Sequence, residues 1–177
     1  MSSYEKELEA EALYIYDKKD VFYQNDFSFC YDVYVRIKIF SKEALDLANV
    51  EIPYMSYGDS SESIKGLDAN TYNMVDGAVV KTPMSKKNVF TDKVSDHLSV
   101  VKFSLPEVRE GSVIEYKYTL KTRYFSRLGR FDIQHDYPVL HSLIDINLPE
   151  FIGYMINSHG LLSFDINQEY SDNIFRL

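Results

Sequence analysis

The strongest constraint on the fold is a long run of alternating side chains between Phe27 and Phe40. The apolar positions are Phe27, Phe29, Tyr31, Val33, Val35, Ile37 and Ile39. Because successive side chains of a β-strand point to opposite faces, this pattern predicts a strand with one face in a core and the other near water. Val113 to Leu120 alternates in the same way. The chain is therefore expected to be built on a sheet.

Shorter β-prone runs occupy most of the remaining chain, and turn residues separate them. We expect further strands at Leu13–Tyr16, Val21–Gln24, Val50–Ile52, Ile64–Met74, Ala78–Thr82, Asn88–Thr91, Leu98–Leu105, Phe131–Gln134, Val139–Leu148, Tyr154–Asn157, Leu161–Ile166 and Asn173–Leu177. The charged residues Asp17 to Asp20 are interpreted as a turn between the first two of these. Short helical turns are expected at Tyr4 to Ala12 and Ser41 to Ala48.

These patterns predict an all-β fold, an antiparallel β-sandwich of immunoglobulin-like architecture with at most a short N-terminal helix. Residues 1–177 are expected to form a single domain. Asp76-Gly77 between two β-prone runs is the clearest hairpin signal, and it predicts a positive φ at Gly77. Ile37 and Tyr116 are expected to point into the core.

The charge and composition argue against several classes of protein. The chain has 177 residues and a formal net charge of −8, which disfavours a nucleic-acid binder. Its apolar runs are too short to span a bilayer. The single cysteine, Cys30, can form neither an internal disulfide nor a thiolate zinc site. The 15 tyrosines and 11 phenylalanines suit a pleated, half-buried surface.

The residues contain no recognisable catalytic set, and we expect neither a metal nor another cofactor. Cys30 has no histidine or basic group at a diagnostic spacing, so it is interpreted as a small packing residue rather than a nucleophile. The histidines at positions 97, 135, 141 and 159 follow no metal-binding spacing and are interpreted as surface or rim residues. The abundant carboxylates are interpreted as solvated.

The segment Lys121 to Arg130 is the one basic cluster in the sequence. Its candidate binding residues are Arg123, Tyr124, Arg127 and Arg130. Because guanidinium groups match the geometry of carboxylates and sulfates, the cluster predicts a site for a small anion or a sugar acid. The alternative, which we favour, is a solvated loop or strand end whose aromatic side chains pack inward.

Several stretches follow the pattern and order of a known family. They are EAEALYIY (Glu9–Tyr16), VRIKI (Val35–Ile39), VEIPY (Val50–Tyr54), ANTYN (Ala69–Asn73), LPEVREGSVIEYKY (Leu105–Tyr118) and YPV (Tyr137–Val139). From these motifs the chain resembles domain of unknown function 3857. The resemblance implies the N-terminal β-sandwich of larger, exported proteins of Gram-negative bacteria, in which a transglutaminase-like domain follows.

The same resemblance implies a function for this chain. It would be a non-catalytic accessory domain whose partner is the downstream domain of its own polypeptide, with residues from about position 170 beginning the next segment. The protein would be periplasmic or at the cell surface, with its signal peptide absent from this sequence. The alternatives are a glycan- or peptide-binding module on a tyrosine-rich sheet face and, less favoured, a stand-alone enzyme.

Overall fold

The structure, a computed structural model, describes residues 9–56, 62–123, 131–149 and 174–176. Within these ranges the chain is almost entirely β-structure. The strands are β1 (Ala12–Gln24), β2 (Ser28–Ile39), β3 (Asn49–Met55), β4 (Ser63–Val75), β5 (Ala78–Pro83), β6 (Val89–Lys93), β7 (Leu98–Ser104), β8 (Val113–Thr122), β9 (Ser142–Asn147) and β10 (Ile174–Arg176). Two short 3-10 helices, η1 (Lys42–Ala48) and η3 (Lys86–Asn88), complete the described elements.

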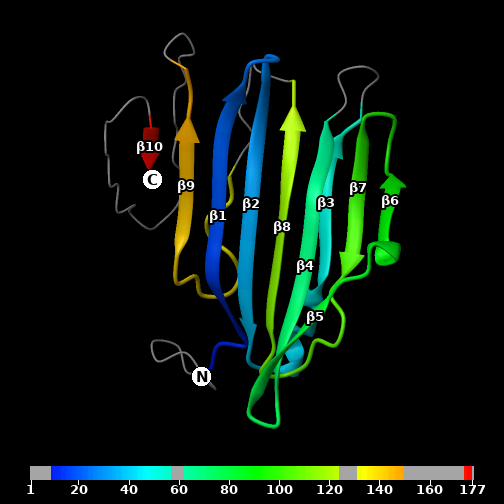
Figure 1. The fold of residues 1–177 in the computed structure, drawn as a ribbon, viewed down its shortest axis with the longest axis vertical. Coiled ribbons are helices and arrows are strands. Elements are labelled where there is room, and N and C mark those ends of the chain that lie inside the picture. The colour runs from blue at the N-terminus through cyan, green and yellow to red at the C-terminus, as the bar shows by residue number, and fades with distance from the viewer. Residues whose placement is uncertain (1–8, 57–61, 124–130, 150–173, 177) are drawn as a thin grey trace.

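The strands form two sheets that pack as a sandwich, which confirms the predicted fold class. The large sheet has the order β10-β9-β1-β2-β8-β4-β5, and the small sheet has the order β3-β7-β6 (Figure 1). All neighbouring strands in the described sheets are antiparallel except β1 and β9, which run parallel. β1 therefore has one antiparallel and one parallel neighbour.

The two alternating segments predicted from the sequence are the neighbouring strands β2 and β8. Their register places Ile37 opposite Ile114 and Val35 opposite Tyr116. Ile37 and Ile114 are both buried, and Tyr116 packs against the same apolar cluster, where its ring meets Phe103 at 6.0 Å between centroids. The predicted inward direction of Ile37 and Tyr116 is confirmed.

The inner face of the large sheet carries two apolar clusters. The first lies between the sheets and combines residues from β1, β2, β4 and β8 with residues from β3, β7 and η1. The second is centred on Val21, Phe29 and Ile144, and Phe131 and Ile133 pack against it. Because β2 contributes to both clusters, one continuous strand face connects them.

The charged residues Asp17 to Asp20 were expected to form a turn, and this expectation is wrong. They lie in the middle of β1, where Asp17 pairs with Val35 and Asp20 pairs with Asp32. A register shift between Tyr14 and Tyr16 inserts one extra residue into β1. This β-bulge turns the side chains of Asp17 and Lys19 to the inner face. Strand pairing on both sides of β1 thus overrides the local turn propensity.

The other expected elements have mixed outcomes. Ser41 to Ala48 corresponds to the 3-10 helix η1, and Val139 to Leu148 is shortened to β9. Phe131 to Gln134 is not a strand, because its apolar side chains cover the second cluster instead of entering the sheet. The expected strands at 154–157 and 161–166 and most of the expected N-terminal helix lie outside the described residues.

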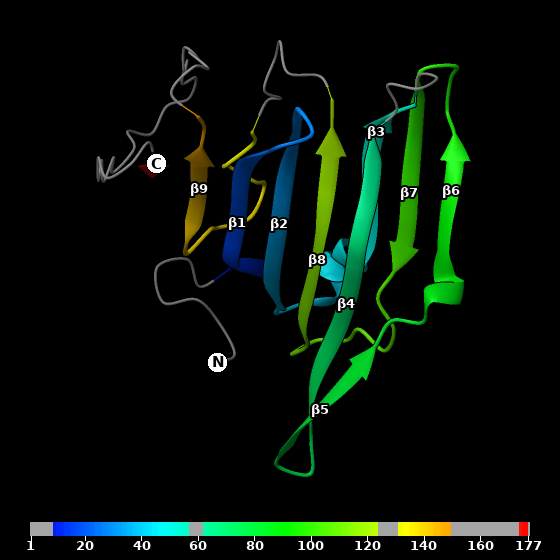
Figure 2. The ribbon, with the colours of Figure 1, turned by 45° about the horizontal axis from the view of Figure 1, so that its top comes forward.

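The predicted hairpin turn at Asp76-Gly77 is confirmed. Asp76 has φ 49° and Gly77 has φ 79°, both in the left-handed region that a type I′ turn requires. β4 and β5 pair up to this turn, with Val75 opposite Ala78. The hairpin extends beyond the end of the neighbouring strand β8 (Figure 2).

Replacing Ile37 by alanine should lower the free energy of unfolding by about 2–5 kcal/mol, because the side chain is buried on both the β1 and β8 sides and would leave a cavity. Urea unfolding measures the loss. Val79→Ala, at a side chain that is 66% exposed, is the matched control and should change little. A loss below about 1 kcal/mol for Ile37→Ala would contradict the placement of the core.

Replacing Gly77 by valine should destabilise the hairpin through the backbone alone. A Cβ at this position meets no atom within 4 Å, so the cost of about 1–2 kcal/mol comes from forcing a β-branched residue to positive φ. Gly77→Asn is the control and should cost less, because asparagine tolerates this region. Equal stability of the two variants in urea would show that the turn can relax to a negative φ.

Candidate functional site

Of the predicted basic site, the structure describes one of the four candidate residues. Arg123 is exposed at the end of β8, and Tyr124, Arg127 and Arg130 lie outside the described residues, so this site stays a prediction. The neighbouring Lys121 is engaged within the sheet. Its Nζ donates to Gln24 Oε1 at 2.8 Å and to Asp26 Oδ2 at 2.5 Å. Hydrogen bonds from Lys121 and Ser28 lower the pKa of Asp26 to about 2.

Cys30 lies on the outer face of the large sheet, between Phe22 of β1 and Lys121 of β8. The residue is only 2% exposed, and burial raises the pKa of its thiol. A raised pKa keeps the thiol protonated at neutral pH and lowers its reactivity. This environment is consistent with the interpretation of Cys30 as a packing residue.

The histidines occupy separate environments. His97 and His141 are exposed, His159 lies outside the described residues, and His135 packs over β1 beside Asp17. No group of three histidine, cysteine or carboxylate side chains is placed to hold a metal ion in the described part of the chain. The interpretation of the histidines as surface or rim residues did not foresee the contact of the half-buried His135 with Asp17, which is 118 positions away in the sequence.

Asp17 is the centre of a charged cluster on the inner face of the large sheet. Its side chain is 1% exposed, and Lys19 Nζ donates to Oδ1 at 2.8 Å and to Oδ2 at 2.7 Å. His135 Nε2 lies 2.8 Å from Asp17 Oδ2. The His135 ring stacks on Tyr14, with 4.0 Å between centroids and 2° between the planes. Lys19 Nζ also donates to the carbonyl oxygen of Asp132 at 3.1 Å.

The electrostatics of this cluster keep Asp17 ionised and its aromatic neighbours neutral. Burial alone would raise the pKa of Asp17, but hydrogen bonds from His135 and Lys19 outweigh it and lower the pKa below the ordinary value. Burial and the nearby Asp17 charge raise the pKa of Tyr14 and of Tyr118 to about 12. The cluster is thus a buried carboxylate whose charge is balanced by its hydrogen-bonding partners and whose neighbours are neutral tyrosine rings.

The position of the cluster indicates a structural role. Backbone hydrogen bonds join the same two segments: Tyr14 donates to Pro138, Leu140 donates to Tyr14, and Asp17 donates to His141, at 2.8–2.9 Å. Together with the Asp17–His135 contact they fix residues 131–141 against β1. A carboxylate–histidine pair can orient an imidazole for catalysis, but the thiol of Cys30 lies on the opposite face of the sheet.

A second polar network lies on the outer face and is centred on Glu115 of β8. Tyr34 Oη donates to Glu115 Oε2 at 2.7 Å, and Tyr72 Oη donates to Oε1 at 3.1 Å. Arg36 Nε donates to Oε2 at 2.9 Å, and its Nη2 contacts the same oxygen. The Arg36 guanidinium also stands 5.8 Å from the centre of the Tyr72 ring. Burial opposes ionisation of Glu115, but the hydrogen bonds from Tyr34 and Arg36 prevail and lower its pKa.

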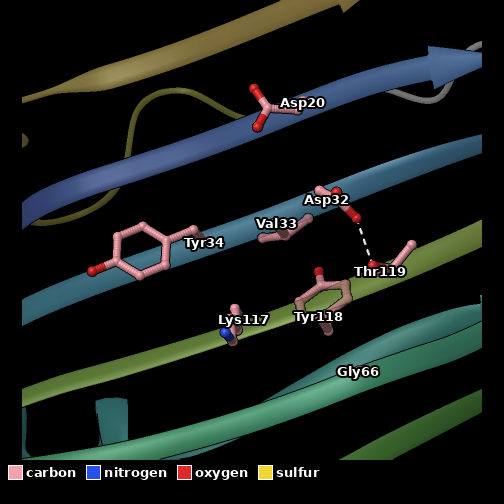
Figure 3. A pocket seen from close by; sticks show the side chains of 8 residues that line it. All are labelled: Asp20, Asp32, Val33, Tyr34, Gly66, Lys117, Tyr118 and Thr119. Atoms are coloured by element: carbon pink, nitrogen blue, oxygen red, sulfur yellow. Dashed lines mark hydrogen bonds between the residues drawn. The ribbon is translucent and has the colours of Figure 1, made fainter.

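Beside this network the outer face has an open hollow, which Figure 3 shows from close by. Its outward lining residues are Asp20, Asp32, Tyr34, Lys117 and Thr119, and Gly66 of β4 leaves one side without a side chain. Thr119 Oγ1 donates to Asp32 Oδ1 at 2.5 Å, and Lys18 Nζ lies 2.6 Å from Asp20 Oδ2. Carboxylate, hydroxyl and ammonium groups of this kind can hydrogen-bond the hydroxyl groups of a sugar or the backbone of a peptide.

The LPEVREGSVIEYKY motif has a structural role that is separate from the two polar networks. Its Ser112 is fully buried, accepts from the backbone N–H of Arg109 at 2.9 Å and donates to Asn73 Oδ1 at 2.6 Å. Asn73 Nδ2 in turn donates to the carbonyl oxygen of Glu107 at 2.9 Å. The motif therefore joins the start of β8 to the β4–β5 hairpin.

Comparison with known proteins gives the same assignment as the motifs. The model of the family DUF3857, a Domain of Unknown Function for which a structure has been solved, matches residues 25–166. The chain belongs to this family. A search of curated proteins finds no match to it.

Solved structures show the fold of this DUF3857 domain. Among the 26 matching chains is a "putative protease" from Parabacteroides distasonis ATCC 8503, with 19% sequence identity and a TM-score of 0.67. The match covers 94% of this chain and 34% of that one. The DUF3857 chain thus spans about a third of the length of this structural relative. At this level of identity the likeness concerns the fold alone.

The Asp17 cluster should make the stability of the DUF3857 domain depend on pH. Since the pKa of Asp17 is lower in the folded state, its stabilising contribution is present above the unfolded value of 3.8 and is lost as the pH falls through the folded value. Asp17→Asn should cost about 1–3 kcal/mol near pH 7, and its difference from the wild type should shrink at acidic pH. Urea unfolding at several pH values measures both effects.

Asp20→Asn is the matched control for this experiment. Asp20 lies on the same strand, but its side chain is 34% exposed and pairs with Lys18 on the outer face. Asp20→Asn should lower the free energy of unfolding less than Asp17→Asn does near pH 7. Equal losses for the two variants, or no loss for Asp17→Asn, would contradict the role given to the buried cluster.

Proposed function

We propose that this DUF3857 domain is a non-catalytic accessory domain that packs on, or positions, a downstream domain of an exported, transglutaminase-like protein. The observation that carries the proposal is the match to one third of a longer chain that is named a "putative protease". A domain that fills only part of a longer chain commonly packs against the rest of that chain.

The described polar groups support an accessory role. Asp17 and His135 connect a covering segment to β1, and Glu115 connects β2, β4 and β8 through Arg36, Tyr34 and Tyr72. Cys30 is buried and its thiol is held protonated. The chemically suggestive residues of the described chain are thus accounted for by contacts within the domain.

We further propose that the protein is exported and works in the periplasm or at the cell surface. This assignment follows from the family resemblance of the motifs. Among the described residues, none of the helices has the length and apolar character needed to cross a bilayer. On the family resemblance alone, the proposed location is outside the cytoplasm, with a transglutaminase- or protease-type domain as the catalytic part of the same protein.

A glycan- or peptide-binding module is the second candidate, and one observation favours it. Tyr16, Tyr34 and Tyr72 all lie on the outer face, with the Tyr16 and Tyr34 rings 5.9 Å apart, and Tyr34 lines the hollow of Figure 3. Aromatic rings beside hydrogen-bonding groups suit sugars and peptides. Tyr34 and Tyr72 are already engaged by Glu115, which makes this candidate second to the accessory role.

The test compares the full-length gene product with a version that lacks residues 1–177. Without the accessory domain the remaining protein should unfold at a lower temperature and hydrolyse or cross-link peptide substrates more slowly. Residues 1–177 alone should show no such turnover. Differential scanning calorimetry and a peptide-turnover assay provide the two readouts.

Unchanged stability and turnover after removal of residues 1–177 would overturn the accessory role. Titration of the domain with panels of glycans and peptides then tests the second candidate. Binding that Tyr34→Ala weakens, and that Phe27→Ala leaves unchanged, would support the module. Phe27 is the control because it is 69% exposed and sits in the β1–β2 turn, away from the Glu115 network.

A further inference from the structure

One side of the sandwich is formed by a long segment that buries almost nothing. From Met74 to His97 no residue is buried, and all but Thr82, Met84 and Val89 are exposed. The segment nevertheless has regular structure, since it holds the end of β4, all of β5, η3 and all of β6. Strands are normally stabilised by burying one face, so this segment, here named the β5–β6 flank, is unusual.

The flank contains one edge strand of each described sheet. β5 is the last strand of the large sheet and β6 is the last strand of the small sheet. In both views β6 lies at the edge of the molecule beyond β7, and β5 lies lower, beside the lower part of β4 (Figures 1 and 2). Edge strands offer unpaired backbone groups and are usually covered or protected.

Exposed apolar side chains are concentrated on the same flank. Six of the nine large apolar side chains that are exposed in the described chain belong to it: Met74, Val75, Val79, Val80, Phe90 and Val94. Met74 and Val79 face each other across the β4–β5 hairpin, with 63% and 66% of their surfaces exposed. Phe90 is 63% exposed on β6. Exposed apolar side chains concentrated in one segment of the chain are a signal of an interaction site.

The hairpin within the flank is held in place by the family motif. Arg109 Nη2 donates to the carbonyl oxygen of Met74 at 3.2 Å, and Thr82 Oγ1 donates to Glu107 Oε2 at 3.2 Å. Met84 N donates to the carbonyl oxygen of Ala69 at 2.8 Å. The Arg109 contact holds the hairpin near its turn, and the Thr82 and Met84 contacts hold it at its base. The apolar side chains are therefore presented on a pre-organised support, which reduces the entropic cost of binding.

The charge of the flank differs from that of the rest of the chain. Its four lysines and three aspartates give a formal charge of +1, whereas the whole chain carries −8. Lys81, Lys86 and Lys87 are exposed around the hairpin base. Two copies of the chain that met through this flank would bring like-charged lysines together, while a partner with an acidic rim would be attracted.

We propose that the β5–β6 flank is the docking surface for a folded domain of the same, longer polypeptide, one with an apolar centre and an acidic rim. This inference rests on the proposed accessory function and names the surface through which it acts. The longer chain of the structural relative, of which the present fold fills 34%, has the additional length such a domain needs. An interface within a chain buries roughly 600–1,500 Å², which the β4–β5 hairpin and β6 together can supply.

Hydrogen exchange on the full-length gene product tests the inference. Amides of Met74 to His97 should exchange about tenfold or more slowly in the full-length protein than in residues 1–177 alone. The double variant Met74→Ser/Val79→Ser and the single variant Phe90→Ser should abolish this protection in the full-length protein. Met55→Ser is the matched control, because Met55 is an exposed apolar residue (42%) at the end of β3, outside the flank, and protection should persist.

The possible results separate this inference from the proposed function. Protection that appears on another surface of residues 1–177 would overturn the flank as the docking site and leave the accessory role intact. Absence of protection anywhere, or a coding sequence without a further folded domain, would overturn both. If residues 1–177 alone showed flank protection that rises with protein concentration, and sedimentation showed that they self-associate, the flank would be assigned to self-association. That result would overturn the proposed partner.

Discussion

The pairing of β2 with β8 is the interaction on which the rest of the structure depends. Its register aligns two strictly alternating strands, so that one face of each enters the core and the other carries charge. A slip by one residue would exchange Ile37 with Arg36 and place a guanidinium in the interior. On the inner side this pairing supports both apolar clusters, and on the outer side it brings Arg36 to Glu115.

The bulge in β1 interrupts the regular alternation of inward and outward side chains. It places the charged side chain of Asp17 in the interior. Before the bulge, Ala12 and Tyr14 face the core; after it, Asp17, Lys19 and Val21 do. The inward carboxylate is tolerated because Lys19 and His135 satisfy it, and satisfying it fixes residues 131–141 over the sheet. A buried ion pair of this kind adds little to the net free energy of folding, because desolvating the charges offsets their attraction. It favours the native arrangement over others, because an arrangement that breaks the pair leaves a buried charge without compensation.

The sequence predicts what local patterns determine. The strand faces of β2 and β8 follow from period-two alternation, and the Asp76-Gly77 turn follows from the backbone preferences of its two residues. The bulge was missed, although its signal is present: the inward apolar positions change from even (Ala12, Tyr14) to odd (Val21, Tyr23), which one extra residue in a continuous strand explains. The Asp17–His135 contact and the β1–β9 pairing join distant segments, and no local pattern encodes them. The exposure of the β5–β6 flank also depends on distant contacts. Its local sequence resembles that of buried strands, so the sequence did not predict the exposure.

The parallel pairing of β1 with β9 has a consequence for how the chain reaches its fold. β1 and β2 form a hairpin that can assemble as soon as both have been synthesised, but the second neighbour of β1 is supplied only by Ser142 to Asn147. Val21 and Phe29 of the second apolar cluster pack against Ile144 and Ile146. On a nascent chain they therefore stay exposed until nearly the whole described sequence has left the ribosome. Closure of so long a loop is entropically costly and slow. β1, the first of the described strands in chain order, is consequently among the last of them to be completed, and until then its exposed apolar face is prone to aggregation.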